Sequence, residues 1–187
     1  MLERHRSQFN NCLRDSRVEL VPIARGTPYD QSLIHLDSLV SPDEPIIVSC
    51  CDNISPLRGC MPVLKEMLKR YDLILVTPKL NEWMGYGVVE VACGEVLAFK
   101  DSAQVAKDAE HHYIDGGISI LKSGLIRRAQ SFEGGFQAYI DKIMSEKKVA
   151  SYIPDAWFDI GTPDAYRHTC ASELFRNLFV KSKCISR

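Results

Sequence analysis

The 187-residue sequence has no long apolar run, no excess of charge of one sign and no paired cysteine motif. No segment approaches the ~18 consecutive apolar residues that span a bilayer, so we do not expect a membrane protein. Lys and Arg number 23 against 24 Asp and Glu, and this balance argues against a nucleic-acid partner. The seven cysteines include no C-x-x-C pair, which indicates neither a zinc site nor a disulfide framework.

The remaining composition is that of a globular protein. Residues 1–6 are charged and no apolar stretch follows them, so they do not resemble a secretory signal. We therefore expect reduced, mostly buried thiols and a cytoplasmic location. The length predicts a single domain over residues 1–187, with a sizeable core.

Hydrophobic periodicity predicts an α/β protein with a mixed sheet. The apolar run 45–51 does not alternate, which predicts a central strand buried on both faces. A helix over 59–70 and a buried strand over 72–77 follow, and together they predict a βαβ unit with parallel strands. The other expected elements are a helix over 3–13, a strand over 17–21, a turn at 26–28 and a helix over 33–40. Further on, we expect a hairpin over 86–92 and 95–99, strands over 112–121 and 149–153, and helices over 122–130, 135–147 and 164–179.

Two aspartates end predicted strands. Asp52 follows the run 45–51, and Asp159 stands before a glycine turn in the stretch 157–163. Two interpretations of Asp159 are open: an ordinary loop residue before a helix capped by Thr162, or a cation ligand. Asp52 is likewise either a turn residue or a ligand. If both lie at one sheet edge, their oxygens suit Mg²⁺.

An ordered series of motifs resembles the sugar-1-phosphate nucleotidyltransferases, also called nucleotide-sugar pyrophosphorylases. The resemblance is strongest over residues 15–178, and its most specific motif is the stretch 157–163. The other matching motifs are Gly26-Thr27, Cys51-Asp52, Tyr86-Gly87-Val88-Val89, Phe99-Lys100-Asp101 and Ile114-Asp115-Gly116-Gly117-Ile118.

The resemblance implies a Rossmann-like nucleotide-diphospho-sugar transferase fold and a Mg²⁺-dependent reaction. In that reaction a nucleoside triphosphate and a hexose or heptose 1-phosphate form a nucleotide sugar and release pyrophosphate. Asp52 and Asp159 are implied as the metal ligands and catalytic residues. The implied substrate-binding residues are Gly26 and Thr27 near the nucleobase, and Gly87, Asp115 and Gly117 facing the sugar.

Departures from the family pattern leave the activity open. The family's N-terminal glycine-rich loop, which cradles the triphosphate, is absent from this sequence. We therefore expect an N-terminally incomplete version of the fold. The expected Glu-Lys after Phe99-Lys100 is Asp101-Ser102, and the expected Asn-Ala-Gly is Asp115-Gly116-Gly117. Lys100 is a candidate replacement for the lysine, although on a strand it points to the opposite face.

Two hypotheses follow from these matches and departures. The first is an active nucleotidyltransferase, and the second is a non-catalytic relative that serves as a sugar-phosphate-binding or regulatory subunit. Because a missing first unit exposes an edge of the strand at 46–51, we also expect a homodimer or a complementing chain.

Two further sequence features have weaker claims to chemistry. Cys50-Cys51 is interpreted as a pair of core thiols in preference to a nucleophile. His111 and His112 are neighbours on a predicted strand, so they point to opposite faces and do not share a metal ion.

Overall fold

The computed structural model describes residue 41 and residues 44–80, 86–100, 112–122 and 124–180. These residues belong to one compact unit, Val40–Arg187. The elements expected between residues 3 and 40 lie outside the described residues, and so do residues 101–111. In the described part of the chain, no helix has the length and apolar character needed to cross a membrane.

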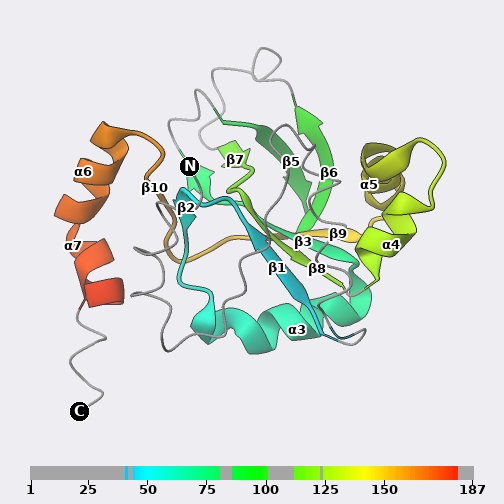
Figure 1. Cartoon of the computed structure of the whole chain (residues 1–187), viewed down its shortest axis with the longest axis horizontal. Helices are drawn as coiled ribbons and strands as arrows, with labels where there is room; N and C mark the ends of the chain where they lie inside the picture. The colour runs from blue at the N-terminus through cyan, green and yellow to red at the C-terminus, as the bar shows by residue number, and fades with distance from the viewer. Residues whose placement is uncertain (1–40, 42–43, 81–85, 101–111, 123, 181–187) are drawn as a thin grey trace, which may run out of the picture. The chain divides into compact units, whose positions relative to one another are not determined.

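A mixed sheet flanked by helices forms the centre of the described structure (Figure 1), which confirms the α/β fold class. Its eight strands lie in the order β1-β8-β3-β9-β6-β5-β7-β4. They are β1 (Ile46–Ser49), β3 (Leu73–Val76), β4 (Lys79–Leu80), β5 (Val88–Ala92), β6 (Glu95–Lys100), β7 (His112–Ile114), β8 (Ile118–Leu121) and β9 (Val149–Tyr152). A separate two-stranded sheet pairs β2 (Asn53–Ile54) with β10 (Phe158–Asp159).

Helices surround this sheet on several sides. The α-helices are α3 (Met61–Arg70), α4 (Leu125–Gln130), α5 (Gly135–Ser145), α6 (Pro163–Ala171) and α7 (Glu173–Phe175). A short 3-10 helix, η1 (Arg58–Cys60), precedes α3, and a π-helical turn, η3 (Arg176–Val180), follows α7. The predicted helices over 59–70, 122–130 and 135–147 are thereby confirmed, with shorter bounds.

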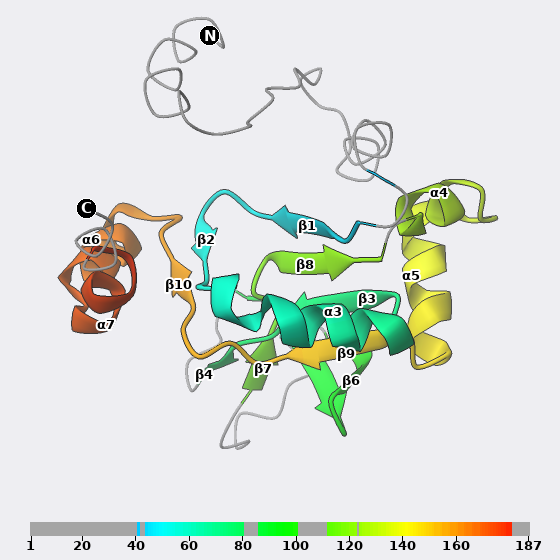
Figure 2. The same cartoon turned by 90° about the horizontal axis from the view of Figure 1, so that it is seen from below.

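The strand directions place three carboxyl ends on one side of the sheet. β8 is antiparallel to both β1 and β3, and β3 is parallel to β9, so β1, β3 and β9 all run the same way. Figure 2 shows these three strands pointing toward β2 and β10. The predicted parallel relation of the strands around α3 is confirmed, with β8 lying between them.

The main core lies between α3 and one face of the sheet (Figure 2). Leu64 and Leu68 are the buried residues of α3, as expected from an apolar stripe at helical spacing. They pack with Tyr71, the residue that follows α3, and with a cluster from the sheet: Ile74, Val76, Ile118, Ile120 and Ala150. Every residue of β3 is buried, which confirms the prediction of a buried strand there.

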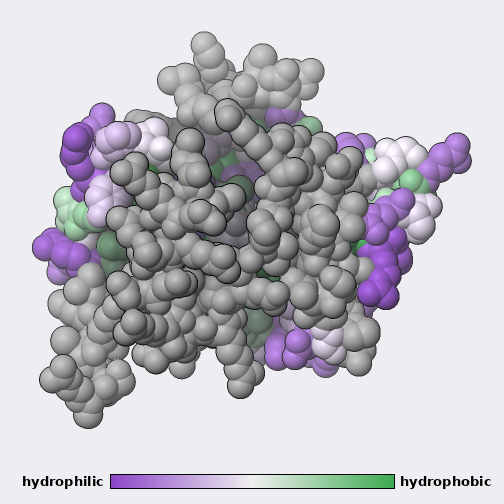
Figure 3. Space-filling model, in the orientation of Figure 1, coloured by the Kyte–Doolittle hydropathy of each residue, from purple (hydrophilic) through white to green (hydrophobic). Residues whose placement is uncertain are grey.

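The two ends of the sheet carry different helices. α4 and α5 pack on each other near the amino end of β9, while α6 and α7 follow β10 at the opposite end (Figures 1 and 2). The outer side of α4 and α5 is largely hydrophilic in Figure 3. The chain continues from the carboxyl end of β1 into β2, and from that of β9 into β10.

The predicted hairpin of β5 and β6 is confirmed. Ala92 pairs with Glu95, so the turn contains only Cys93 and Gly94. Both turn residues have positive φ, 53° and 79°. Positive φ at both central residues is the mark of a type I′ turn, whose twist matches that of the flanking strands.

The strand at 46–49 corrects one prediction. β1 is a terminal strand of the described sheet, and Ile47 is 45% exposed, so the strand is not central and not buried on both faces. A continuous apolar run does not report how many neighbours a strand has. The expectation of a homodimer or a complementing chain stays a prediction.

Two more boundaries differ from the predictions. Residues 112–121 form two strands, β7 and β8, and the residues between them, including Gly116 and Gly117, are not in strand conformation. The predicted helix over 164–179 is interrupted at Ser172, whose backbone is extended and whose hydroxyl accepts a hydrogen bond from Phe175 N. The hydroxyl thus caps a new helix, as serine does at helix starts. Leu174, in the second of these helices, is 50% exposed.

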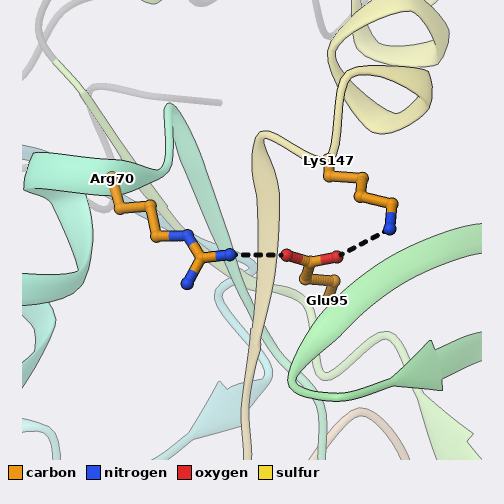
Figure 4. Close-up of polar contacts among 3 residues, drawn as sticks. All are labelled: Arg70, Glu95 and Lys147. Carbon is orange, nitrogen blue, oxygen red and sulfur yellow. Dashed lines mark hydrogen bonds and ion pairs between the residues drawn. The ribbon is translucent and has the colours of Figure 1, made fainter.

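Glu95 joins three elements away from the carboxyl ends of the strands (Figure 4). Its side chain is only 10% exposed; Oε1 accepts a hydrogen bond from Arg70 Nη2 at 3.1 Å, and Oε2 lies 3.9 Å from Lys147 Nζ. Arg70 ends α3, Lys147 follows α5, and Glu95 itself pairs with Ala150 of β9. The carboxylate therefore links the end of α3 and the turn after α5 to the paired strands β6 and β9.

We predict that Glu95→Gln lowers the free energy of unfolding by about 1–2 kcal/mol, because it removes the charge from a nearly buried carboxylate that accepts a hydrogen bond from Arg70. Urea denaturation measures this change. Glu66→Gln is the matched control, since the Glu66–Lys69 pair has side chains 71% and 73% exposed. We expect Glu66→Gln to lower the free energy of unfolding by no more than about 0.5 kcal/mol. Equal losses in the two variants would contradict the assigned role of Glu95.

Candidate functional site

The β2–β10 pairing brings the two predicted ligands together. Asp159 pairs with Asn53, the residue after Asp52, and Ile160 N donates a hydrogen bond to Asp52 O at 2.8 Å. Asp52 follows the carboxyl end of β1, and Asp159 ends β10. The two aspartates are thus neighbours on adjacent backbone segments at the expected side of the sheet.

The two carboxylates also face a common point. A Cβ placed on Gly161 would lie 2.9 Å from Asp52 Oδ2 and 3.1 Å from Asp159 Oδ1. The exposed glycine therefore leaves open the space that both oxygens border. Two carboxylate oxygens that border one open space can each supply one ligand atom to a cation.

The Asp159 carboxylate is held by two donors. Gly161 N donates to Oδ1, and the Tyr86 hydroxyl donates to Oδ2, both at 2.7 Å. Burial, followed by the hydrogen bond and the negative charge of Asp159, raises the pKa of Tyr86 to about 12. The phenol therefore stays protonated at neutral pH and keeps donating to the carboxylate.

The segment after Asp159 is a capped helix start as well. Thr162 Oγ1 accepts a hydrogen bond from Ala165 N at 3.1 Å, and Pro163 is the first residue of α6. Thr169, within α6, donates to Asp159 O at 3.3 Å. The cap and the paired aspartates coexist, since the cap fixes the helix that anchors the backbone of Asp159.

Three of the predicted sugar-facing residues lie beside the aspartates. Asp115 N donates to Gly87 O at 2.8 Å, and Asp115 Oδ1 accepts from Gly117 N at 2.9 Å. Gly117 O in turn accepts from Cys50 N, at 2.8 Å, at the end of β1. Hydrogen bonds thus join Gly87, Asp115 and Gly117 into one cluster next to Asp52, which we call the sugar-side cluster.

The two glycines that follow Asp115 have steric reasons to be glycine. A Cβ on Gly116 would lie 2.7 Å from Val76 O. Gly117 has a φ of +66°, and a Cβ there would overlap the side-chain amide of Asn53. Close approach of Val76 O at Gly116, and of the Asn53 side chain at Gly117, therefore accounts for glycine at these two positions.

Two aromatic residues complete the site, and the sequence analysis assigned no site role to either. The ring of Tyr86 packs edge-on against Trp157, with centroids 5.6 Å apart and an interplanar angle of 79°. Trp157 Nε1 donates to Gly116 O at 2.8 Å. Their signal in the sequence is position: Tyr86 directly precedes Gly87, and Trp157 lies two residues before Asp159.

The two thiols next to Asp52 differ from the sequence prediction in their exposure, and the surroundings of Cys50 do not favour a nucleophile. Cys50 and Cys51 are exposed, so the prediction of core thiols is wrong, as it is for the exposed Cys93 and Cys170. Partial burial, then the charges of Asp52 and Asp115, raises the pKa of Cys50. The thiolate that attack requires is thereby disfavoured.

Several residues named from the sequence are not placed at the site by the described structure. Gly26, Thr27 and His111 lie outside the described residues, as does the side chain of His112. Lys100 Nζ pairs with Glu90 across the hairpin at 2.9 Å, and its side chain is 41% exposed. Lys100 is thus engaged in a cross-strand ion pair on β6.

The donor set suits a hard cation. In the part of the chain that the structure describes, no group of three or more His, Cys, Asp or Glu side chains is arranged to hold a metal. A closed zinc site needs more protein ligands than the two aspartates provide. Mg²⁺ is commonly held by one or two carboxylates and completes its shell with water and substrate phosphates. Asp52 and Asp159 fit that requirement.

Comparison with solved structures confirms the nucleotidyltransferase-like fold. A Bacillus anthracis protein assigned as a glucose-1-phosphate thymidylyltransferase, solved in complex with sucrose, matches with a TM-score of 0.69 and 14% identity, covering 95% of this chain and 72% of that chain. HddC from Yersinia pseudotuberculosis matches with a TM-score of 0.63 and 16% identity, and the match covers 88% of this chain and 72% of HddC. The structure of HddC in complex with GMP-PN matches with a TM-score of 0.62 and 16% identity, and the match covers 89% of this chain and 73% of HddC. No family model and no curated protein matches the chain.

We predict that Gly117→Ala destabilises the protein more than Gly124→Ala. Both glycines have positive φ, +66° and +74°, so both variants carry a left-handed strain of about 1–2 kcal/mol. An alanine methyl at 124 meets open space, whereas at 117 it overlaps Asn53. Thermal unfolding of the two variants measures the difference, and equal melting temperatures would contradict the close packing at Gly117.

Proposed function

We propose that the chain is a Mg²⁺-dependent sugar-1-phosphate nucleotidyltransferase. In this proposal it transfers a nucleoside monophosphate from a nucleoside triphosphate to a hexose or heptose 1-phosphate, with release of pyrophosphate. The observation that carries the proposal is the β2–β10 pairing, which sets Asp52 and Asp159 side by side. The motif series and the shared fold support the same conclusion.

The proposed reaction is a displacement at phosphorus. A phosphate oxygen of the sugar 1-phosphate attacks the α-phosphorus of the triphosphate, and a new phosphorus–oxygen bond forms. The bond from the α-phosphorus to the oxygen bridging the α- and β-phosphates breaks, and pyrophosphate leaves with that electron pair. Because both reactants are anions, positioning and charge neutralisation supply most of the rate enhancement.

Each part of the site has a role in this proposal. Asp52 and Asp159 would hold Mg²⁺, which would supply positive charge to the phosphate oxygens. The sugar-side cluster of Gly87, Asp115 and Gly117 borders the sugar. Tyr86 and Trp157 pack beside that cluster and present aromatic surface next to the aspartates.

The neighbours agree with these substrate classes. One neighbour is assigned as a glucose-1-phosphate thymidylyltransferase and was solved with sucrose, and another was solved with GMP-PN. A sugar and a nucleotide are thus ligands of proteins that share this fold.

The second candidate function is a non-catalytic sugar-phosphate-binding or regulatory subunit. The ion pair between Lys100 and Glu90 favours it, because the nearest sequence replacement for the family's lysine is already neutralised. Asp115 adds a negative charge beside Asp52, where both substrates are anionic. These features weaken phosphate binding without affecting the fold.

Pyrophosphate release distinguishes the two functions. The purified chain is incubated with Mg²⁺, each nucleoside triphosphate and a panel of sugar 1-phosphates. We expect release with one combination and its loss by at least about 100-fold in Asp52→Asn and Asp159→Asn, since charge stabilisation is the largest catalytic term. Asp164→Asn is the control, because Asp164 lies at the start of α6 in an exposed pair with Arg167.

Three other outcomes are informative. Activity that is equal in all three variants would contradict the assigned aspartates. No release, together with sugar-phosphate binding that requires Asp52 and Asp159, would establish the binding role. Neither release nor binding with any sugar 1-phosphate would contradict both functions.

A further inference from the structure

We propose that Tyr86 is a positioning residue that sets the orientation of the Asp159 carboxylate for cation binding. This inference rests on the proposed cation site of Asp52 and Asp159 and adds a residue to it. The hydroxyl of Tyr86 donates to Asp159 Oδ2, and this contact joins residues 73 positions apart in the chain.

The carboxylate has one donor for each oxygen. Gly161 N, two residues further along the same turn, binds Oδ1, while Tyr86 binds Oδ2. A single donor leaves a carboxylate free to swing about that contact, whereas two donors on different oxygens fix its plane. Oδ1 is the oxygen that shares the Gly161 position with Asp52 Oδ2. Tyr86 thus keeps Oδ1 turned toward Asp52.

The two hydrogen bonds leave room for a cation. A carboxylate oxygen has about two lone-pair positions, and each oxygen of Asp159 uses one of them. The remaining positions stay available for coordination. Groups that orient metal ligands in this way typically account for 10–100-fold in metal affinity or activity.

The ring that carries the hydroxyl is itself fixed. Trp157 packs edge-on against it, and Trp157 Nε1 is bonded to Gly116 O. Gly87, the next residue after Tyr86, accepts a hydrogen bond from Asp115 N. The position of the hydroxyl is therefore set by the sugar-side cluster and by Trp157. Tyr86 thus connects this cluster to the cation ligand Asp159.

Tyr86→Phe tests the assignment, because it removes the donor and keeps the ring against Trp157. The probe is Mn²⁺ alone. The whole chain is titrated with Mn²⁺, and the concentration of free Mn²⁺ is measured by electron paramagnetic resonance. We expect the dissociation constant to rise about 10–100-fold in Tyr86→Phe. A second readout is the Mn²⁺-dependent rise in melting temperature, which shrinks as the affinity falls.

Tyr139→Phe is the matched control. The Tyr139 hydroxyl accepts a hydrogen bond from Arg128 Nε at 2.8 Å, so this variant also loses a partly buried hydrogen bond. Tyr139 belongs to α5, at the opposite end of the sheet from β10 (Figures 1 and 2). We expect Tyr139→Phe to bind Mn²⁺ like the unchanged chain, with a metal-free melting temperature lowered about as much as in Tyr86→Phe.

The outcomes separate this inference from the proposed function. If Asp159→Asn abolishes Mn²⁺ binding while Tyr86→Phe binds like the unchanged chain, the role of Tyr86 is overturned and the cation site stands. Equal weakening by Tyr86→Phe and Tyr139→Phe also overturns it, since the effect is then one of stability. If the unchanged chain does not bind Mn²⁺, the cation site is overturned, and the assignment of Tyr86 with it.

Discussion

A two-residue antiparallel pairing holds the candidate site together. Phe158 pairs with Ile54 and Asp159 with Asn53, and Ser55 Oγ adds a hydrogen bond to Ala156 O at 2.8 Å across 101 positions of the chain. Closing so long a loop has an entropic cost that grows only slowly with length. A ladder of two residues is nevertheless too short to be stable alone.

Packing around β10 supplies the missing stability. The ring of Phe158 lies edge-on to that of Phe175 in α7, with centroids 5.2 Å apart. Thr169 in α6 donates to Asp159 O, and Tyr86 donates to the carboxylate of the same residue. The short ladder is therefore fixed from the helical side and from the sheet side, and this fixes the distance between the two carboxylates.

Local patterns were sufficient for much of the fold. The stripe of α3 and the turn at Cys93 and Gly94 depend on neighbours in sequence, and both were predicted from the residues. The edge position of β1 and the exposure of Leu174 depend on which distant segments pack there. No periodicity carries that information, so these features were found only in the structure.

The same division applies to the site. Their positions at predicted strand ends, together with the resemblance, selected Asp52 and Asp159. The structure places them together, although their roles stay predictions. Tyr86 and Trp157 were missed, because their function as donors depends on contacts with segments about 40–75 positions away in the chain. The surrounding glycines were interpretable only once Asn53 was seen to occupy the space beside Gly117.

The central claim is that Asp52 and Asp159 share one cation. Anomalous diffraction from crystals of the chain soaked in Mn²⁺ tests it most directly, since Mn²⁺ replaces Mg²⁺ at oxygen sites and scatters anomalously. The account predicts one anomalous peak between Asp52 Oδ2 and Asp159 Oδ1, within coordination distance of both. A peak bound to only one of these carboxylates, or none at either, would contradict it.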